Sequence, residues 1–314
     1  MASLIDFHTH FFSKSFFNAL ARASAFSDDP ESAVKRVASA AGIEIPSQDN
    51  DEHLQKWLRE MDRHGVSHAV SFASVPEEIS VVAEAAERSE GRLIPFTVID
   101  PTKADCSEKL DELLGSRGFR GAVMFPAMHR YAIDGPEADR VFRILNNHRA
   151  TAVVHCGMLK VPLRDRFGLE RNYDLNLANP LQLISVADKH ADVSFVIPHF
   201  GAGFFRETLI AGAQCENVYV DTSSSNSWRA TQPTKLQIAD IFERALGVFG
   251  ADRILFGTDS CVFPRGWRHD ILLAQREALG ACGLDSSEKA KVLGENAAHL
   301  LRIRSQSDAI RSPL

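Results

Sequence analysis

The stretch LIDFHTH, Leu4 to His10, decides how the rest of the chain is interpreted. Its first four residues form a short apolar run typical of a buried strand, and two histidines two positions apart end the stretch. Because side chains at i and i+2 of a strand share a face, His8 and His10 point the same way. Two neutral imidazoles that converge from one strand form half of a transition-metal site. Taken alone, the pair also fits two polar residues at a wet strand edge.

Seven more apolar, β-branched runs follow this one along the chain. The eight expected strands are Leu4–Phe7, His68–Ala73, Leu93–Ile99, Gly121–Phe125, Ala152–His155, Val193–Ile197, Val218–Asp221 and Ile254–Gly257. Most are apolar without alternation, which predicts burial on both faces, as in a parallel sheet. Helical patterns separate them; between Leu54 and Met61, for example, apolar residues repeat at i, i+3, i+4 and i+7. Repeated strand–helix alternation predicts an α/β fold, a (β/α)₈ TIM barrel.

A doubly wound open sheet is the rival architecture. It is disfavoured because the first strand is followed by FHTHFF rather than by a glycine-rich dinucleotide turn. Residues 1–304 are therefore interpreted as a single barrel domain, and residues 305–314 as a polar C-terminal tail. Residues 11–50 are too long for an ordinary βα loop. We expect them to form a helical insertion after strand 1, with helices near 16–25 and 31–41, that caps the barrel mouth.

The composition excludes several classes of protein. The 314 residues are 45% hydrophobic and 24% charged, with a formal net charge of −6, as in an ordinary globular protein. That charge gives no electrostatic footprint for nucleic acid or an anionic membrane. Five scattered cysteines argue against a disulfide framework. The N-terminus lacks the basic segment of a signal peptide and no apolar run is long enough to span a bilayer, so we expect a soluble, cytoplasmic protein.

Three further polar residues directly follow apolar runs. His155 ends strand 5, His199 follows strand 6 and Asp259 follows strand 8. Because the carboxyl ends of barrel strands open at one mouth, where barrel enzymes place their chemistry, we expect these residues to meet His8 and His10 there. Most of the other histidines fall on or beside predicted helices, where a surface role is the simpler interpretation.

These motifs resemble a known family. The segments that carry the resemblance are IDFHTH, GFRGAVMFPA, AVVHCG, VIPHFGAGFF, VYVDTSS, RILFGTDS and KVLGENAAHLL. Together they resemble the amidohydrolase superfamily of metal-dependent barrels, and within it the amidohydrolase-related branch, often called amidohydrolase 2. The similarity runs from about Leu4 to about Leu301. That branch includes aminocarboxymuconate semialdehyde decarboxylase and aromatic-acid decarboxylases alongside true hydrolases.

The resemblance implies a set of metal ligands. It makes His8, His10, His155 and Asp259 ligands of one divalent ion, with zinc expected, and makes His199 a catalytic residue. His199 would orient or deprotonate a metal-bound water, or polarise the substrate, while Asp259 would be ligand, base or both. Zinc lowers the pKa of its bound water to about 7, which explains the need for a nearby proton acceptor. Binuclear relatives carry a lysine at the end of strand 4; no lysine occurs here between Lys109 and Lys160, so we expect one metal.

Substrate recognition is assigned to cations and aromatics that follow the strands. The residues closest after their strands are His129, Trp228 and Arg229. Such groups suit a small carboxylate by paired hydrogen bonds and stacking. For any one of them, a solvated loop position is the simpler alternative.

Three functions follow from this reasoning. The first is a metal-dependent hydrolase whose metal-bound water attacks a small carboxylate-bearing ester, lactone or amide. The alternative is a metal-dependent, non-oxidative decarboxylase of an aromatic or muconate-type acid, and the third is a barrel that binds metal or ligand without catalysis. A homo-oligomer is considered because Phe16, Phe17 and Phe26 look exposed in the cap, although these aromatics could instead cover the substrate.

Overall fold

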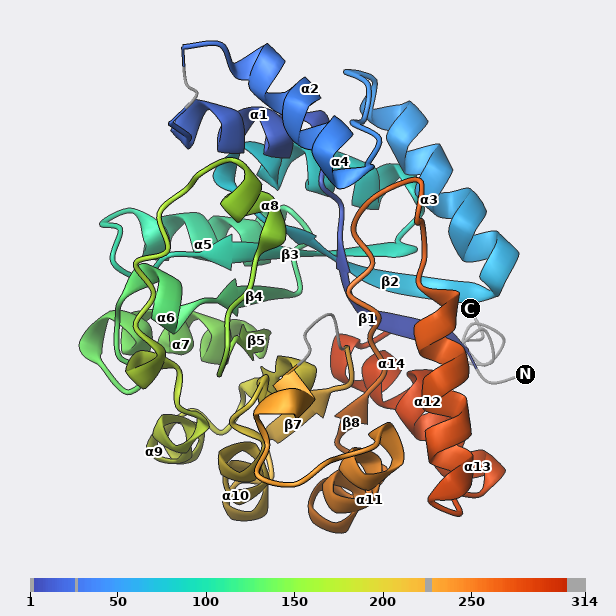
Figure 1. The fold of residues 1–314 in the computed structure, drawn as a ribbon. Coiled ribbons are helices and arrows are strands. Elements are labelled where there is room, and N and C mark those ends of the chain that lie inside the picture. The colour runs from blue at the N-terminus through green and yellow to red at the C-terminus, as the bar shows by residue number, and fades with distance from the viewer. Residues whose placement is uncertain (1–2, 26–27, 224–227, 304–314) are drawn as a thin grey trace, which may run out of the picture.

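Eight parallel strands, each followed in sequence by helices, form a ring in the computed structural model, which describes residues 3–25, 28–223 and 228–303 (Figure 1). The strands are β1 (Leu4–His10), β2 (Val66–Ala73), β3 (Leu93–Ile99), β4 (Gly121–Met124), β5 (Thr151–Val154), β6 (Ser194–Ile197), β7 (Val218–Asp221) and β8 (Ile254–Leu255). Each strand pairs in parallel with the next one along the chain. The predicted (β/α)₈ barrel is confirmed, and the doubly wound alternative is wrong because its strand order would not follow the sequence.

The helices cover the outside of the ring. The principal ones are α3 (Asn50–His64), α4 (Ile79–Arg88), α5 (Cys106–Ser116), α7 (Pro136–His148), α9 (Leu183–Lys189), α10 (Phe205–Gln214), α11 (Ile238–Phe249) and α12 (His269–Ala281). Shorter helices are α6 (Pro126–His129), α8 (Pro162–Arg166), α13 (Ser286–Ala290) and α14 (Asn296–Leu301). Each principal helix turns an apolar stripe toward the strands, as the sequence periodicity predicts. None of the helices in the described ranges has the length and apolarity needed to cross a membrane.

The ring closes between β1 and the segment that follows β8. The Phe7 amide donates to the Phe256 carbonyl at 2.8 Å, the Asp259 amide donates to the His8 carbonyl at 2.8 Å, and the His10 amide donates to the Ser260 carbonyl at 2.9 Å. The chain after β8 therefore runs beside the second half of β1. This pairing places Asp259 next to the two histidines of the first strand.

Buried Asp6 holds the same seam together from inside. Its carboxylate accepts hydrogen bonds from the amides of His8 and Thr258, both at 3.0 Å, and from the Thr258 hydroxyl at 2.5 Å. The indole of Trp267, which begins the approach to α12, donates at 2.8 Å. One carboxylate thus links β1, the chain after β8 and the next connection, and leaves none of these donors unsatisfied in the interior.

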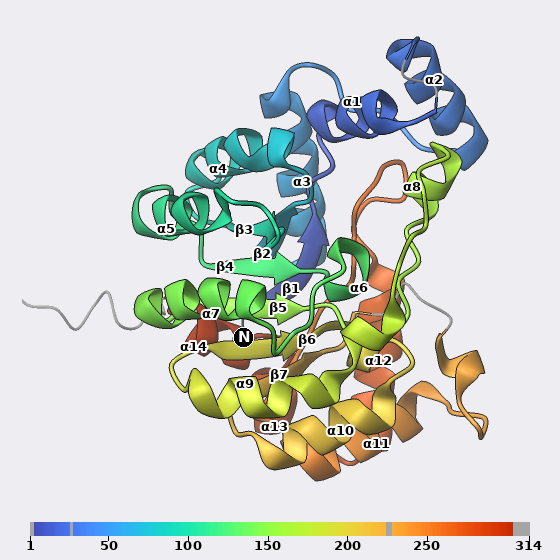
Figure 2. The ribbon, with the colours of Figure 1, turned by 90° about the vertical axis from the view of Figure 1, so that its left-hand side faces the viewer.

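Residues after β1 form the expected helical insertion, called the cap below, with helices α1 (Lys14–Ala23) and α2 (Pro30–Ala41) beside α8 (Figure 2). Phe16 and Phe17 are only 3% and 1% exposed, and they pack with Phe12 and with Phe167 from the connection after β5. The expectation that Phe16 and Phe17 are exposed is wrong, because they supply the core of the cap. Phe26 and the 305–314 tail lie outside the described residues.

Replacing Asp6 by alanine is expected to destabilise the fold by about 3 kcal/mol. The change leaves several buried donors unpaired, and each unpaired group costs roughly 1–3 kcal/mol. Urea unfolding followed by circular dichroism measures the free energy of unfolding. Glu31→Ala, which removes only an exposed 2.8 Å ion pair with Lys35, is the control and should leave the unfolding midpoint unchanged. Equal midpoints for Asp6→Ala and Glu31→Ala would refute the role given to Asp6.

Candidate metal centre

Three ligand atoms from the closing seam converge at the mouth of the barrel. Nε2 of His10 lies 3.3 Å from Oδ1 of Asp259, and Nε2 of His8 lies 3.8 Å from the same oxygen. One ligand atom from each of the three residues lies within 4.8 Å of the others. Two imidazoles and a carboxylate at such spacing are a donor set that zinc and other divalent transition metals bind.

The other ring nitrogen of each histidine already has a partner. Nδ1 of His8 lies 2.8 Å from Oδ2 of Asp221, and Nδ1 of His10 lies 2.8 Å from Oγ of Ser74. A histidine that binds metal through Nε2 carries its proton on Nδ1 and donates it to such a partner. The residues present therefore fit a metal: Asp221 and Ser74 each offer an oxygen that can accept from Nδ1, which leaves Nε2 of both rings for an ion on the side of Asp259.

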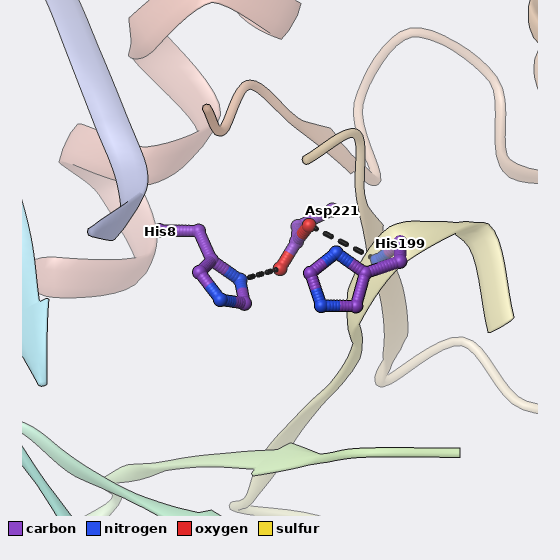
Figure 3. Close-up of side chains that lie close together, drawn as sticks. All are labelled: His8, His199 and Asp221. Atoms are coloured by element: carbon purple, nitrogen blue, oxygen red, sulfur yellow. Dashed lines mark hydrogen bonds and ion pairs between the residues drawn. The ribbon is translucent and has the colours of Figure 1, made fainter. Parts of the chain in front are cut away.

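Asp221, at the end of β7, connects His8 with His199 (Figure 3). Its Oδ1 accepts from the His199 amide at 3.2 Å and from the Ser223 amide at 2.9 Å, and the Ser223 hydroxyl also donates to it. His8, His199 and Asp221 form a second cluster of ligand atoms within 4.8 Å. Because both oxygens of Asp221 already accept hydrogen bonds, we assign this carboxylate to orienting the two histidines rather than to binding the ion.

His199 is presented by an unusual backbone turn after β6. Its φ is 58°, and Phe200 and Ala202 follow at 51° and 43°, so the PHFGAG segment turns in the left-handed region. Asp259 also has a positive φ, 59°. Non-glycine residues held there cost about 1–3 kcal/mol each and cluster at functional sites. Nδ1 of His199 lies 2.8 Å from the Ser223 carbonyl oxygen, which accepts a hydrogen bond from it and leaves Nε2 without a partner among the described residues.

His155 lies beside His199, with ring centroids 5.2 Å apart, and stacks on Phe125 at 5.3 Å. Burial, with the charges of His199 and His8, lowers its pKa to about 3, so the ring is neutral at physiological pH. Neither ring nitrogen has a hydrogen-bond partner within the described ranges. His155 joins neither of the two three-residue clusters, and its assignment as a metal ligand stays a prediction.

Charge is balanced within the site. Burial acts to lower the pKa of His8, but the carboxylates of Asp221, Asp259 and Asp6 outweigh it and raise that pKa above its usual value. Burial acts to raise the pKa of Asp221 and Asp259, but the surrounding imidazoles hold both below the usual range. For His10 burial outweighs Asp259, and its pKa falls. The carboxylates of Asp221 and Asp259 thus stay ionised beside His10, whose pKa is lowered, an arrangement that suits a cation.

Of the three residues assigned to substrate, only His129 has, within the described ranges, a ring contact that leads to the site. His129 ends α6 and is linked to the site through Phe125, whose ring lies 6.4 Å from that of His129 and 5.3 Å from that of His155. Nδ1 of His129 is buried with no hydrogen-bond partner in the described chain. Trp228 is buried, with its ring 5.7 Å from Phe205, while Arg229 is exposed. Their role in binding substrate stays a prediction.

Sequence reasoning missed the residues that orient the ligands. Asp221 carried a signal, since VYVD ends in a polar residue after an apolar run, as do the segments before His155 and His199. Ser74, whose Oγ lies 2.8 Å from Nδ1 of His10, carried no signal because serine is common where a helix begins.

The chain belongs to the amidohydrolase family, since the family model described as amidohydrolase matches residues 5–303. No curated protein sequence matches it. Several solved structures share the fold, and three of them show its range. A 5-carboxyvanillate decarboxylase from Sphingomonas paucimobilis is 14% identical, with a TM-score of 0.65 over 97% of this chain and 100% of that one.

The second is a dihydroxybenzoic acid decarboxylase from a Polaromonas species with bound manganese and the inhibitor 2-nitroresorcinol. It is 16% identical, with a TM-score of 0.63 over 98% of this chain and 99% of that one. The third is a probable 2-pyrone-4,6-dicarboxylic acid hydrolase from Acinetobacter baumannii with bound citric acid. It is 15% identical, with a TM-score of 0.60 over 96% of this chain and 100% of that one. At these identities the likeness establishes the shared fold.

Replacing Asp221 by asparagine is expected to lower the pKa of His8 in metal-free protein, because the largest opposing charge is removed while burial stays. NMR titration of the imidazole carbon-bound protons measures this pKa. Because the pKa of His8 is higher in the folded than in the unfolded wild-type protein, protonation of His8 stabilises the fold. This contribution is fully present below the unfolded pKa of about 6.5 and is lost as the pH rises through the folded pKa. The unfolding free energies of the two proteins should therefore differ most at acidic pH. An unchanged His8 pKa in Asp221→Asn would contradict the ion pair.

Proposed function

We propose that this chain is a metal-dependent, non-oxidative decarboxylase of a small aromatic or unsaturated carboxylic acid. The observation that carries the proposal is the convergence of the Nε2 atoms of His8 and His10 on Asp259, with both Nδ1 atoms already bound. In the proposal His8, His10, His155 and Asp259 hold one divalent ion. When bound, the ion supplies Lewis-acid polarisation of an acidic oxygen of the substrate. Manganese and zinc both suit nitrogen and oxygen ligands.

The full-length likeness to decarboxylases supports this reaction over hydrolysis. The Polaromonas dihydroxybenzoic acid decarboxylase and the Sphingomonas 5-carboxyvanillate decarboxylase share the fold over nearly the whole chain. Both act on aromatic acids according to their names. Hydrolysis is the second candidate, because the probable dicarboxylic acid hydrolase from Acinetobacter shares the fold over 96% of this chain.

The proposed chemistry moves one proton. The bond between the substrate carbon and its carboxylate breaks, CO₂ leaves, and the electron pair stays on the carbon, which takes a proton. His199 and Asp259 are the groups proposed to carry that proton, and the donor recovers it from solvent. Nε2 of His199 carries no proton while Nδ1 donates to the Ser223 carbonyl, so in the proposal it takes a proton from solvent and passes it to the carbon. His129, Trp228 and Arg229 are proposed to hold and orient the substrate.

Elemental analysis of purified protein is expected to find about one divalent transition metal per chain. His10→Ala and Asp259→Ala should each lose most of it, because each removes one ligand from a small donor set. His190→Ala is the control. Nε2 of His190 lies 3.0 Å from Oδ1 of Asp139, outside the metal centre, so this variant should keep the metal content of wild type. Two metals per chain would contradict the argument from the missing lysine of strand 4.

The reaction is tested with a panel of hydroxybenzoic and muconate-type acids, following CO₂ release and the product by mass spectrometry. Decarboxylation should require the metal, stop after chelation, and return on adding Mn²⁺ or Zn²⁺. His199→Ala is expected to reduce kcat by about 10²–10⁴-fold, the usual contribution of a proton-transfer group, with metal content retained. Hydrolysis of ester or lactone substrates without CO₂ release would refute the decarboxylase and establish the second candidate.

A further inference from the structure

Glu78 is a buried carboxylate outside the ligand set, in the turn between β2 and α4. Its side chain is fully buried, and no Lys, Arg or His within the described ranges lies within 4.0 Å to balance its charge. Burial raises its pKa to about 7, although hydrogen bonds from Ser13 and Ser74 act in the opposite direction. Burying a carboxylate without a charged partner costs folding free energy, and the hydrogen bonds that it accepts must offset this cost.

The partners of Glu78 come from two different parts of the site. Oε1 accepts from the amide and the hydroxyl of Ser13, at 2.7 and 2.9 Å, and Oε2 accepts from the Ser74 amide at 3.0 Å. Ser13 is the N-cap of α1, the first cap helix. Ser74 follows β2 and places its Oγ 2.8 Å from Nδ1 of His10. Glu78 therefore joins the start of the cap to the residue that fixes the ring of His10.

A second contact runs in parallel between the same two regions. The ring of His10 lies 4.8 Å from that of Phe12, which stacks on Phe16 of α1 with centroids 3.9 Å apart and planes 4° from parallel. Phe12 has a positive φ, 41°, which a bulky side chain adopts only where its surroundings hold it. His10 is thus braced on its Nδ1 edge by Ser74 and on its face by the cap.

We propose that Glu78 is a positioning residue, which holds Ser74 so that His10 keeps the ring orientation and tautomer for binding metal through Nε2, and which fastens the cap to the metal centre. This inference rests on the proposed function, because it takes His10 to be a ligand. Outer partners of this kind change metal affinity by about 10–100-fold when they are removed.

The test measures the affinity for Mn²⁺ and for Co²⁺ by competition with a chelator, together with the visible absorption of the Co²⁺ form, in the full-length protein. Glu78→Gln keeps the volume but replaces one acceptor by a donor, so it is expected to weaken Co²⁺ binding about tenfold and shift the absorption band. Ser74→Ala should do the same. Because both act on His10 by one route, the double variant should lose little more than either single variant.

The control variant for cap stability is Asp29→Ala. It removes the N-cap of α2, a 3.1 Å bond to the Ser32 amide in the same cap, without touching Glu78 or Ser74. Metal affinity should be unchanged even if the thermal unfolding temperature falls. If Glu78→Gln does not fold, Ser13→Ala is used for the same test, because it removes one of the three hydrogen bonds to the Glu78 carboxylate. Its Co²⁺ affinity is expected to fall about threefold.

Two results would overturn the inference while leaving the metal centre in place. One is a Co²⁺ affinity of Glu78→Gln that lies within twofold of wild type. If Ser13→Ala replaces that variant, the corresponding result is a Co²⁺ affinity equal to that of wild type. The other is a double variant whose losses multiply, which would show that Glu78 and Ser74 act independently. The proposed metal centre itself fails in a different way: wild type and His10→Ala would then bind Co²⁺ equally.

Discussion

The seam between β1 and the chain after β8 is the constraint on which the site depends. Strand pairing alone would place β1 and β8 side by side, but the four donors gathered by Asp6 fix their relative register. With that register set, the Asp259 amide bonds the His8 carbonyl, and the carboxylate of Asp259 faces His10. Two ends of the chain, some 250 residues apart in sequence, thereby contribute to one donor set.

Backbone strain accompanies the residues proposed for catalysis. His199 and Asp259 both adopt left-handed conformations, which an L-residue keeps only where neighbouring interactions compensate. For His199 the compensation comes from Asp221 and Ser223, which bind its amide and its Nδ1. Gly257, just before the strained segment, permits the close packing, since a Cβ there would lie 2.9 Å from that of His8. The two strained residues and the close approach at Gly257 thus lie together at the end of the barrel where His8 ends its strand.

The cap is part of the site rather than an appendage. Its apolar core takes Phe167 from the connection after β5, and Arg166 of α8 donates to the Ala40 carbonyl of α2 at 3.0 Å. Through Ser13 and Phe12 the same cap reaches the histidine at the end of β1. The cap and the barrel are thus joined both by apolar packing and by hydrogen bonds.

The sequence by itself determined the barrel and the helical insertion after β1, and it singled out five polar residues at the carboxyl ends of strands. Apolar runs that end in His155, His199 or Asp259 carry this information locally, because a buried parallel strand and its carboxyl-end residue are recognisable without knowing what lies beside them. Only the tertiary structure decided that Phe16 and Phe17 are core residues, that Asp221 serves His8, and that Ser74 and Glu78 support His10. Those roles depend on contacts between segments 60 to more than 200 residues apart, and no local pattern records which distant side chain completes a hydrogen bond.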